Sequence, residues 1–262
     1  MNYVISGGIG DFLQCLPHFL SDSNPNNKYL VVSHFKEAQF FFDAVGKSVA
    51  MIETYSNNEE LNAILSTVSR LELVSFCPRT KYFDYNPFGP CKPLFNNDLR
   101  VIGIHLNGSR YAEKVNHDAN LPSKNIPLSL LDVLSKYKCN VVLFGSYSEV
   151  KLMQIEESDS LKVISQREIT DSLSFMSICD VFVGCDSAFK TMSSMLKKAT
   201  LVWLPDYDDK FRDNVFINPY VSDCIMKTVR FSSAEYETMK EATNKTEEFL
   251  KENGFAKSYQ SQ

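Results

Sequence analysis

The 262-residue sequence lacks the features of several large protein classes. No window approaches the roughly 18 uninterrupted apolar residues that a membrane-spanning helix needs. The first residues, MNYVISGGIGDF, contain no basic segment followed by a long apolar run, so we expect no signal peptide. The net charge of −5 supplies no overall positive field, which argues against tight non-specific binding of nucleic acid.

Cysteine pairs at metal-binding or disulfide-framework spacing are also missing. The seven cysteines are scattered and odd in number, and no two of them form a C-x-x-C pair. We therefore expect buried free thiols and a reducing compartment, which indicates a cytoplasmic protein. The four histidines are too dispersed to predict a metal-binding triad.

Motifs that identify common enzyme classes are absent as well. The sequence has no G-x-S-x-G motif, which argues against an α/β-hydrolase, and no G-x-x-x-x-G-K-[ST] motif, which excludes the P-loop kinases. A D-x-D string, Asp206 to Asp208, lies among other charged residues. We interpret it as a solvated loop rather than a site that binds phosphate through a metal ion, with contact to a donor sugar as the alternative.

The sequence does contain a repeated alternation of short apolar runs and helical patterns. Four strands are expected in the first part, at residues 3–6, 29–33, 49–54 and 71–76, with helices over 12–20, 37–45 and 58–69. A proline-rich stretch follows at 77–97. Five further strands are expected after it, at 100–106, 140–144, 161–164, 181–183 and 200–204, with helices over 128–136, 148–155, 172–178 and 187–196.

Strands separated by helices of this length are typical of parallel sheets built from right-handed βαβ units. The sequence therefore predicts an α/β protein with two Rossmann-like, doubly wound lobes. The first lobe would comprise residues 1–97 and the second residues 98–230. We expect the last segment, 231–262, to form a polar helix that crosses back to the first lobe, followed by a tail.

The first candidate site lies where the first strand ends. Gly7, Gly8 and Gly10 precede Asp11 at the start of the following helix. Backbone amides at such a helix N-terminus favour an anion or a sugar hydroxyl. The spacing is not the G-x-G-x-x-G of dinucleotide-binding proteins. The alternative interpretation is that Asp11 only adds a favourable charge to the first helical turn.

Two further candidate sites follow strand ends in the second lobe, where ligands of open α/β sheets usually bind. One is the segment Asn107-Gly108-Ser109-Arg110, whose hydroxyl, amides and guanidinium suit phosphate oxygens. The other runs from Gly184 to Thr191 and includes Asp186 and Ser187. The alternatives are a plain turn for the first segment and ordinary helix capping for the second.

Taken in order, these segments resemble the family 9 glycosyltransferases, which are the bacterial ADP-heptose:lipopolysaccharide heptosyltransferases and their relatives. The matching segments are residues 9–11 with Pro17, then 102–109, 124–127, 141–149 and 180–188. The stretch from about 98 to 205 carries most of the likeness. The resemblance implies a GT-B fold, in which two Rossmann-like lobes face each other across a cleft.

The resemblance also implies roles for individual residues. Asp11 would be the general base that deprotonates the acceptor hydroxyl, in an inverting transfer that needs no metal ion and no cofactor beyond the nucleotide-sugar co-substrate. Ser109 and Lys124 would hold the diphosphate, and Glu149 would bind the ribose hydroxyls. The nucleobase would contact residues 166–170. The other expected donor-binding residues are Asn107, Gly108, Arg110, Gly145, Asp186, Ser187, Ala188 and Lys190.

The sequence departs from the family pattern at three positions and in length. Ala188 stands where the family has a glycine after D-S, Thr191 where it usually has a histidine, and Ile126 where it has the tryptophan of K-x-W-P. These departures concern the sugar and base of the donor more than the class of enzyme. The first lobe is also about half as long as in the family, which implies a trimmed acceptor lobe.

Two acceptors therefore stay open. One is a saccharide of the bacterial envelope, and the other is a hydroxymethylated base in DNA, as in phage-type DNA modification. A basic rim on the first lobe would favour DNA, although scattered solvated side chains are the simpler interpretation; its members would be Lys36, Arg79, Lys81 and Lys92. A different class of function, a catalytically inactive nucleotide-sugar-binding protein, is suggested by Ala188 and Thr191.

Overall fold

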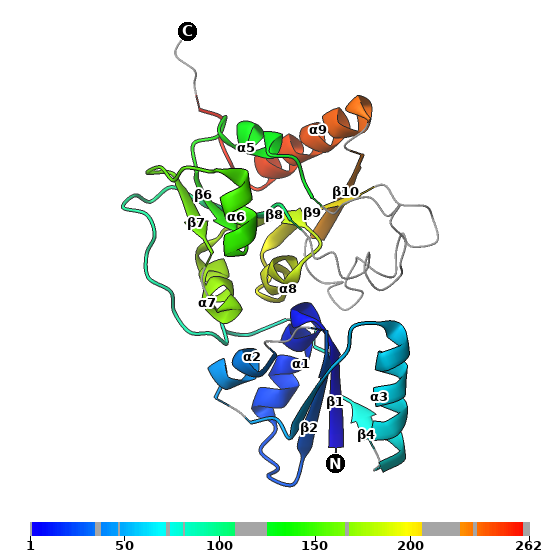
Figure 1. The fold of residues 1–262 in the computed structure, drawn as a ribbon. Coiled ribbons are helices and arrows are strands. Elements are labelled where there is room, and N and C mark those ends of the chain that lie inside the picture. The colour runs from blue at the N-terminus through cyan, green and yellow to red at the C-terminus, as the bar shows by residue number, and fades with distance from the viewer. Residues whose placement is uncertain are drawn as a thin grey trace.

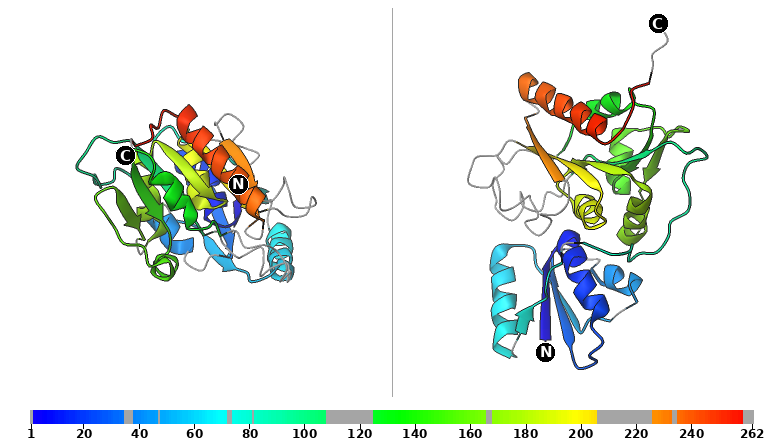
Figure 2. Two further views of the ribbon diagram at one scale, coloured as in Figure 1. Left: turned by 90° about the horizontal axis from the view of Figure 1, so that it is seen from above. Right: turned by 180° about the vertical axis from the view of Figure 1, so that it is seen from behind.

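The computed structural model shows two α/β lobes, each built around its own parallel sheet (Figures 1 and 2). The structure describes residues 2–34, 38–46, 48–71, 74–80, 82–107, 125–165, 168–205, 226–232 and 235–258. The two-lobed α/β architecture predicted from the sequence is confirmed.

The sheet of the first lobe has four parallel strands in the order β3-β2-β1-β4. The strands are β1 (Asn2–Gly7), β2 (Lys28–Ser33), β3 (Met51–Thr54) and β4 (Val74–Phe76). The helices are α1 (Ile9–Ser21), α2 (Ala38–Ala44) and α3 (Asn58–Leu71). Neighbouring residues of β1 point to opposite faces, so Ile5 packs in the cluster that contains α1, whereas Val4 packs with Val68 of α3.

The sheet of the second lobe has six parallel strands in the order β10-β9-β8-β5-β6-β7. The strands are β5 (Val101–His105), β6 (Asn140–Phe144), β7 (Leu161–Ile164), β8 (Val181–Cys185), β9 (Ala199–Pro205) and β10 (Met226–Phe231). The helices are α5 (Ser129–Leu134), α6 (Tyr147–Met153), α7 (Ile169–Ser174), α8 (Ala188–Met195) and α9 (Tyr236–Glu252). Strands β5, β6 and β8 are buried along their whole length, as expected for parallel strands covered on both faces.

The proline-rich stretch between the lobes is bound to both of them. The amide of Thr80 donates to the carbonyl oxygen of Gln14 at 2.8 Å, on the first lobe. Farther along, the amide of Phe83 donates to the carbonyl oxygen of Met195 at 2.6 Å, and the side-chain amide of Asn86 donates to the carbonyl oxygen of Ser174 at 3.0 Å. The described part of this stretch is therefore an ordered strap rather than a loose linker.

The two lobes also share one hydrophobic cluster. Phe12 and Leu13 of α1 belong to the same buried cluster as Phe189, Met192 and Met195 of α8. Helix α1 lies against α8 where the lobes meet (Figure 1). Because α1 follows β1 and α8 follows β8, this contact brings together the regions where the central strands of the two sheets end.

Three local features differ from the sequence-based expectations. Strand β10 was not predicted, because its alternating pattern of exposed and buried residues is that of a sheet edge rather than an apolar run. The helix expected over 172–178 is split into α7 and a short 3-10 helix, Phe175–Ile178. Helix α9 packs on β10, β9 and α5 of the second lobe, so it does not cross back to the first lobe (Figures 1 and 2). Its buried residues Phe249 and Leu250 cover the second sheet instead.

Candidate active site between the two lobes

The turn from β1 to α1 holds Asp11 by its own backbone. One carboxylate oxygen of Asp11 accepts a hydrogen bond from the amide of Gly8 at 3.0 Å. Gly7 has a φ of +118°, and a Cβ atom there would lie 2.2 Å from the same oxygen, so only glycine fits. The turn therefore places the Asp11 carboxylate at the end of β1 and satisfies one amide of the helix N-terminus.

The other oxygen of Asp11 contacts a basic side chain. It lies 2.8 Å from a guanidinium nitrogen of Arg79, and both side chains are about one-third exposed, at 34% and 33%. Arg79 follows β4, which pairs with β1, so the two residues leave neighbouring strands at the same edge of the sheet. His34, at the end of β2, lies on the other side of the turn, where a Cβ on Gly8 would come within 2.8 Å of its ring. Burial lowers the pKa of His34, although the nearby Asp11 opposes this shift.

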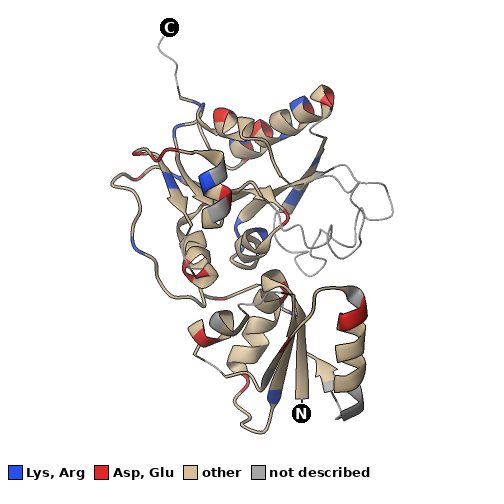
Figure 3. Ribbon diagram, viewed as in Figure 1, with Lys and Arg blue, Asp and Glu red and all other residues tan. Residues whose placement is uncertain are grey.

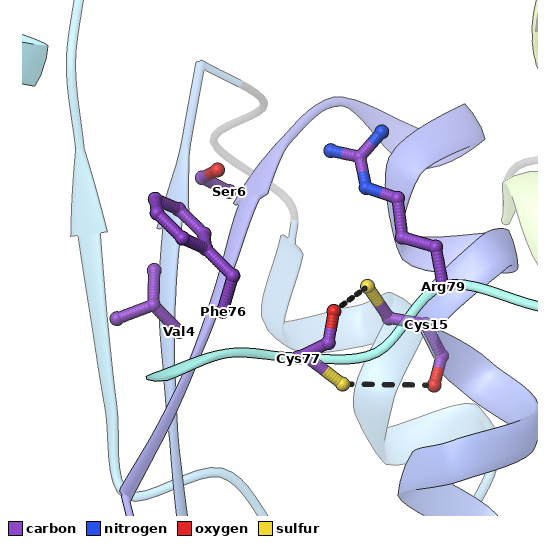
Figure 4. A pocket seen from close by; sticks show the side chains of 6 residues that line it. All are labelled: Val4, Ser6, Cys15, Phe76, Cys77 and Arg79. Carbon is purple, nitrogen blue, oxygen red and sulfur yellow. Dashed lines mark hydrogen bonds between the residues drawn. The ribbon is translucent and has the colours of Figure 1, made fainter. Parts of the chain in front are cut away.

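A cavity of about 470 Å³ opens beside Arg79 in the first lobe (Figure 4). Its lining comes from β1, α1, β4 and the segment after β4, and consists of Val4, Ser6, Cys15, Phe76, Cys77 and Arg79. The Phe76 side chain is 66% exposed, which is unusual for a large apolar ring. The cavity therefore combines an aromatic surface, a hydroxyl and a guanidinium close to Asp11.

The turn from β8 to α8 faces α1 from the second lobe. A Cβ added to Gly10 would lie 3.2 Å from the hydroxyl oxygen of Thr191, so the first turn of α1 approaches α8 closely. Ser187 occupies the N-cap position of α8, but its hydroxyl makes no capping hydrogen bond. This hydroxyl is buried and has no hydrogen-bond partner among the described residues.

The same turn carries a buried ion pair. The ammonium group of Lys190 lies 2.6 Å from a carboxylate oxygen of Asp186, and these side chains are only 5% and 13% exposed. Residues 186 and 190 are one helical turn apart, which places them on the same side of α8. Because Asp186 compensates the charge of Lys190, the features of this turn that suit an anionic ligand are the positive end of the helix and the uncapped hydroxyl of Ser187.

A histidine lies between the ends of three strands of the second lobe. His105, the last residue of β5, is buried, with its Nδ1 3.5 Å from the sulfur of Cys185 on β8. Its Nε2 is 3.9 Å from a carboxylate oxygen of Glu149 in the first turn of α6. The same oxygen accepts a hydrogen bond from the amide of Ser146 at 2.6 Å.

No protein-family model and no curated sequence matches the chain. Solved structures do match it over nearly its whole length. E. coli ADP-heptose LPS heptosyltransferase II is 10% identical, with a TM-score of 0.57, and the match covers 96% of this chain and 99% of that one. A family 9 glycosyltransferase from Veillonella parvula is 10% identical, with a TM-score of 0.55 and coverage of 96% of both chains. E. coli heptosyltransferase WaaC, solved with ADP-2-deoxy-2-fluoro heptose, is 12% identical, with a TM-score of 0.54 and coverage of 97% of this chain and 99% of that one.

The chain has the GT-B fold. In this fold, the sequence-predicted site residues fall into two groups on opposite lobes. The first lobe contributes Gly7, Gly8, Gly10 and Asp11, and the second contributes Gly145, Glu149, Asp186, Ser187, Ala188 and Lys190. The contact between Gly10 and Thr191 connects the two groups. Asn107, also within the described residues, lies just after the end of β5.

Several predicted residues lie outside the described residues of this GT-B chain. They are Gly108, Ser109, Arg110, Lys124, the first two residues of the 166–170 segment, and Asp206 and Asp208. Their roles stay predictions. Within the described ranges, no group of three or more histidine, cysteine, aspartate or glutamate side chains is arranged to hold a metal ion. No described helix is both long and apolar enough to cross a membrane.

Sequence reasoning missed two contacts of the GT-B site. Arg79 was assigned only to a basic rim, although its position just after a strand, like that of Asp11, is a signal that the two lie at one sheet edge. His105 was considered as one of four dispersed histidines and as part of the matching segment 102–109, but no role of its own was predicted for it. His105 ends β5, Cys185 ends β8 and Glu149 follows β6. Because β5 pairs with both β6 and β8, this arrangement predicts that the three residues lie close together.

Proposed function

We propose that this protein is a glycosyltransferase that moves a sugar from a nucleoside-diphosphate sugar to an acceptor hydroxyl, with inversion and without a metal ion. The observation that carries the proposal is the pairing of two different turns across the lobe boundary. One presents a partly exposed carboxylate, that of Asp11, and the other presents an uncapped helix N-terminus at Ser187. A base and an anion site on facing lobes are what this reaction requires.

In the proposed reaction, Asp11 accepts the proton of the acceptor hydroxyl as the oxygen attacks the anomeric carbon. The bond between that carbon and the diphosphate oxygen breaks, and its electron pair leaves with the nucleoside diphosphate. The N-terminus of α8 stabilises the negative charge that develops on the diphosphate. On the sequence resemblance, Ser109 and Lys124 would add a hydroxyl and a positive charge to the same group.

The cavity beside Arg79 supports an acceptor site on the first lobe. It lies next to Asp11, and its exposed Phe76 ring suits the apolar face of a sugar or a nucleobase. Of the four residues expected to form a basic rim, Lys36 and Lys81 lie outside the described residues and Arg79 pairs with Asp11. Figure 3 shows acidic residues on several helices of this lobe, which favours the saccharide over DNA.

The proposal is tested first by ligand binding and donor hydrolysis. A ligand that binds only the native state raises the melting temperature, so one of the UDP-, ADP-, GDP- or CMP-sugars should stabilise the protein. That sugar nucleotide should then be hydrolysed slowly in the absence of acceptor. Stabilisation without hydrolysis or transfer would instead favour the inactive nucleotide-sugar-binding protein. Binding to duplex DNA that weakens steeply with salt would favour the DNA acceptor.

Metal independence gives a second measurement. Because the N-terminus of α8 and Lys124 would stabilise the negative charge of the diphosphate without a metal ion, turnover should survive an excess of EDTA. Complete loss of turnover that Mn²⁺ or Mg²⁺ restores would contradict this assignment and move the chemistry toward Asp206 and Asp208.

A further inference from the structure

The buried His105 connects two of the loops that follow the strands of the second lobe. Its ring lies between the sulfur of Cys185, at the end of β8, and the carboxylate of Glu149, in the first turn of α6. The ring of Phe189 packs edge-on against it, with the ring centres 4.8 Å apart. Strand β5 lies between β6 and β8 in the sheet. A side chain at the end of β5 can therefore contact residues at the ends of both neighbouring strands.

The contacts of His105 favour a charged ring. Burial by itself lowers the pKa of His105, but the interactions with Cys185 and Glu149 outweigh burial and raise the pKa to about 9. Burial also opposes the charged form of Glu149, yet the interactions with His105 and with the Ser146 amide lower the pKa of Glu149 below its usual value. At neutral pH the pair is therefore an imidazolium and a carboxylate, and both ring nitrogens act as donors.

Glu149 is held by neighbouring groups through one of its two oxygens. The oxygen that faces His105 also accepts the hydrogen bond from Ser146. The side chain nevertheless remains 31% exposed. A carboxylate held through one oxygen can accept hydrogen bonds from a ligand through the other.

Some enzymes use a cysteine nucleophile that a neighbouring histidine activates and a third side chain orients. Here the Cys185 side chain is fully buried, so its sulfur has no access to a substrate. The cluster is therefore better suited to orienting Glu149 than to attacking a bond.

We propose that His105 is a positioning residue, which holds Glu149 through one oxygen so that the other oxygen can accept hydrogen bonds from the 2′- and 3′-hydroxyls of the nucleotide ribose, the contact that the family resemblance implies for Glu149. This inference rests on the proposed function and adds to it a specific device for recognising the ribose. The ribose diol offers two O–H donors, and hydrogen bonds to a charged acceptor are about twice as strong as neutral ones. His105 acts through Glu149 and does not itself touch the ligand.

The test compares a nucleotide with its analogue that lacks both ribose hydroxyls. ADP, UDP, GDP and CDP are first titrated into the wild-type protein by calorimetry, and the tightest binder is compared with its 2′,3′-dideoxy form. We expect the wild type to prefer the ribonucleotide by roughly ten- to a hundredfold. In His105→Asn this preference should fall to about threefold or less, because the shorter amide reaches only the Cys185 side. In His105→Gln it should be partly retained, because the longer amide still donates toward Glu149.

Controls separate positioning from general damage to the fold. Glu149→Gln should lose the preference as His105→Asn does, whereas Ser187→Ala should weaken both nucleotides equally. Binding of inorganic pyrophosphate should be unchanged in the His105 variants. If His105→Asn binds pyrophosphate normally and keeps the full preference for the ribonucleotide, the inference is wrong. If no nucleoside diphosphate binds the wild type, the proposed function itself fails.

A pH series on the wild type gives a second measurement that needs no variant. The preference should be constant near neutral pH and should fall as the pH rises through about 9, where His105 loses its proton. The titratable groups that face the ring are Cys185 and Glu149, with the Asp186–Lys190 pair in the next turn. Phosphate and base titrations are common to both nucleotides and cancel in the comparison. A preference that stays constant to pH 10 would overturn the inference.

The unfolding temperature must be followed over the same pH range. A pKa raised from 6.5 to about 9 stabilises the folded protein fully below pH 6.5, and this stabilisation is lost as the pH rises through about 9. Binding is therefore compared only at pH values where the protein remains folded.

Discussion

The turns β1–α1 and β8–α8 occupy equivalent places in their lobes and differ in chemistry. Each joins the end of an interior strand of its sheet to a helix through small residues and carries an aspartate, Asp11 in one and Asp186 in the other. Asp11 is part-exposed, pairs with Arg79 and satisfies the amide of Gly8 itself. Asp186 is only 13% exposed, pairs with Lys190 and leaves the N-cap hydroxyl of Ser187 without a hydrogen bond among the described residues.

The difference shows what a strand-to-helix turn can be used for. A turn whose aspartate accepts a hydrogen bond from its own helix N-terminus has little room for an external anion. It keeps a carboxylate near the surface instead. A turn whose aspartate is engaged elsewhere leaves the helix N-terminus for a ligand. Under the proposed function, the first turn would serve proton transfer and the second would serve phosphate binding.

The largest expected effect is on turnover in Asp11→Asn. Asparagine keeps the size and most of the hydrogen bonding of Asp11 but cannot accept a proton at neutral pH. We expect kcat to fall by about 10²–10⁴-fold, the range for removal of a general base. Donor affinity, measured by calorimetry, should stay close to wild type, because Asp11 belongs to the opposite lobe.

The same preparation of Asp11→Asn decides between the two interpretations of this residue. A carboxylate that only supports the first turn contributes about 0.3–1 kcal/mol to stability and nothing to the reaction. A slightly lower melting temperature with near-normal turnover would therefore assign Asp11 a structural role.

The next largest effect is on stability, in the matched substitution Asp186→Asn. Removing one partner of a mostly buried ion pair weakens the compensation of the other charge, which should lower the free energy of unfolding by up to about 3–5 kcal/mol. The part-exposed pair of Asp11 with Arg79 should be worth only about 0–1 kcal/mol. Chemical denaturation of the two variants measures this contrast. Equal losses of stability would mean that the two turns do not differ as described.

The smallest effect is expected for Ser187→Ala. Because the Ser187 hydroxyl has no hydrogen-bond partner among the described residues, its removal should leave stability unchanged or slightly higher. Binding of the nucleoside diphosphate should weaken by about 1.5–3 kcal/mol, the range for a hydrogen bond to a charged group.

A matched control for Ser187→Ala is available in the same helix. The hydroxyl of Ser193 is buried and bonded to Thr200 at 2.9 Å, so Ser193→Ala should lower stability and leave nucleotide affinity unchanged. If Ser187→Ala lowered stability and kept its affinity, its hydroxyl would be a structural group like that of Ser193.

Most of the fold could be predicted from the sequence because strands that are buried on both faces appear as continuous apolar runs. The apolar runs of β5, β6 and β8 are as continuous as strands covered on both faces must be. Strand β10 escaped prediction because an edge strand alternates and is interrupted by Lys227 and Arg230. The packing of α9 was predicted wrongly because an amphipathic helix reveals that it covers an apolar surface but not which one.

The candidate site could be predicted only in part. Turn residues such as Gly7 and Ser187 are recognisable because they follow strands and precede helices. Contacts that depend on strand order are not, since Arg79 meets Asp11 only because β4 pairs with β1. The proximity of His105 to Glu149 likewise follows from β5 pairing with β6, across 44 residues of sequence.

The hydrophobic cluster shared by α1 and α8 limits how the two lobes can move. A wide hinge opening would expose residues such as Phe12, Phe189 and Met192 to water, and each fully buried side chain of this kind contributes about 1.5–3 kcal/mol. Small sliding of packed helices preserves such contacts, whereas large rotations do not. If the lobes move relative to each other in the proposed reaction, they should therefore shear past each other, with ligands exchanging along the margins of the interface.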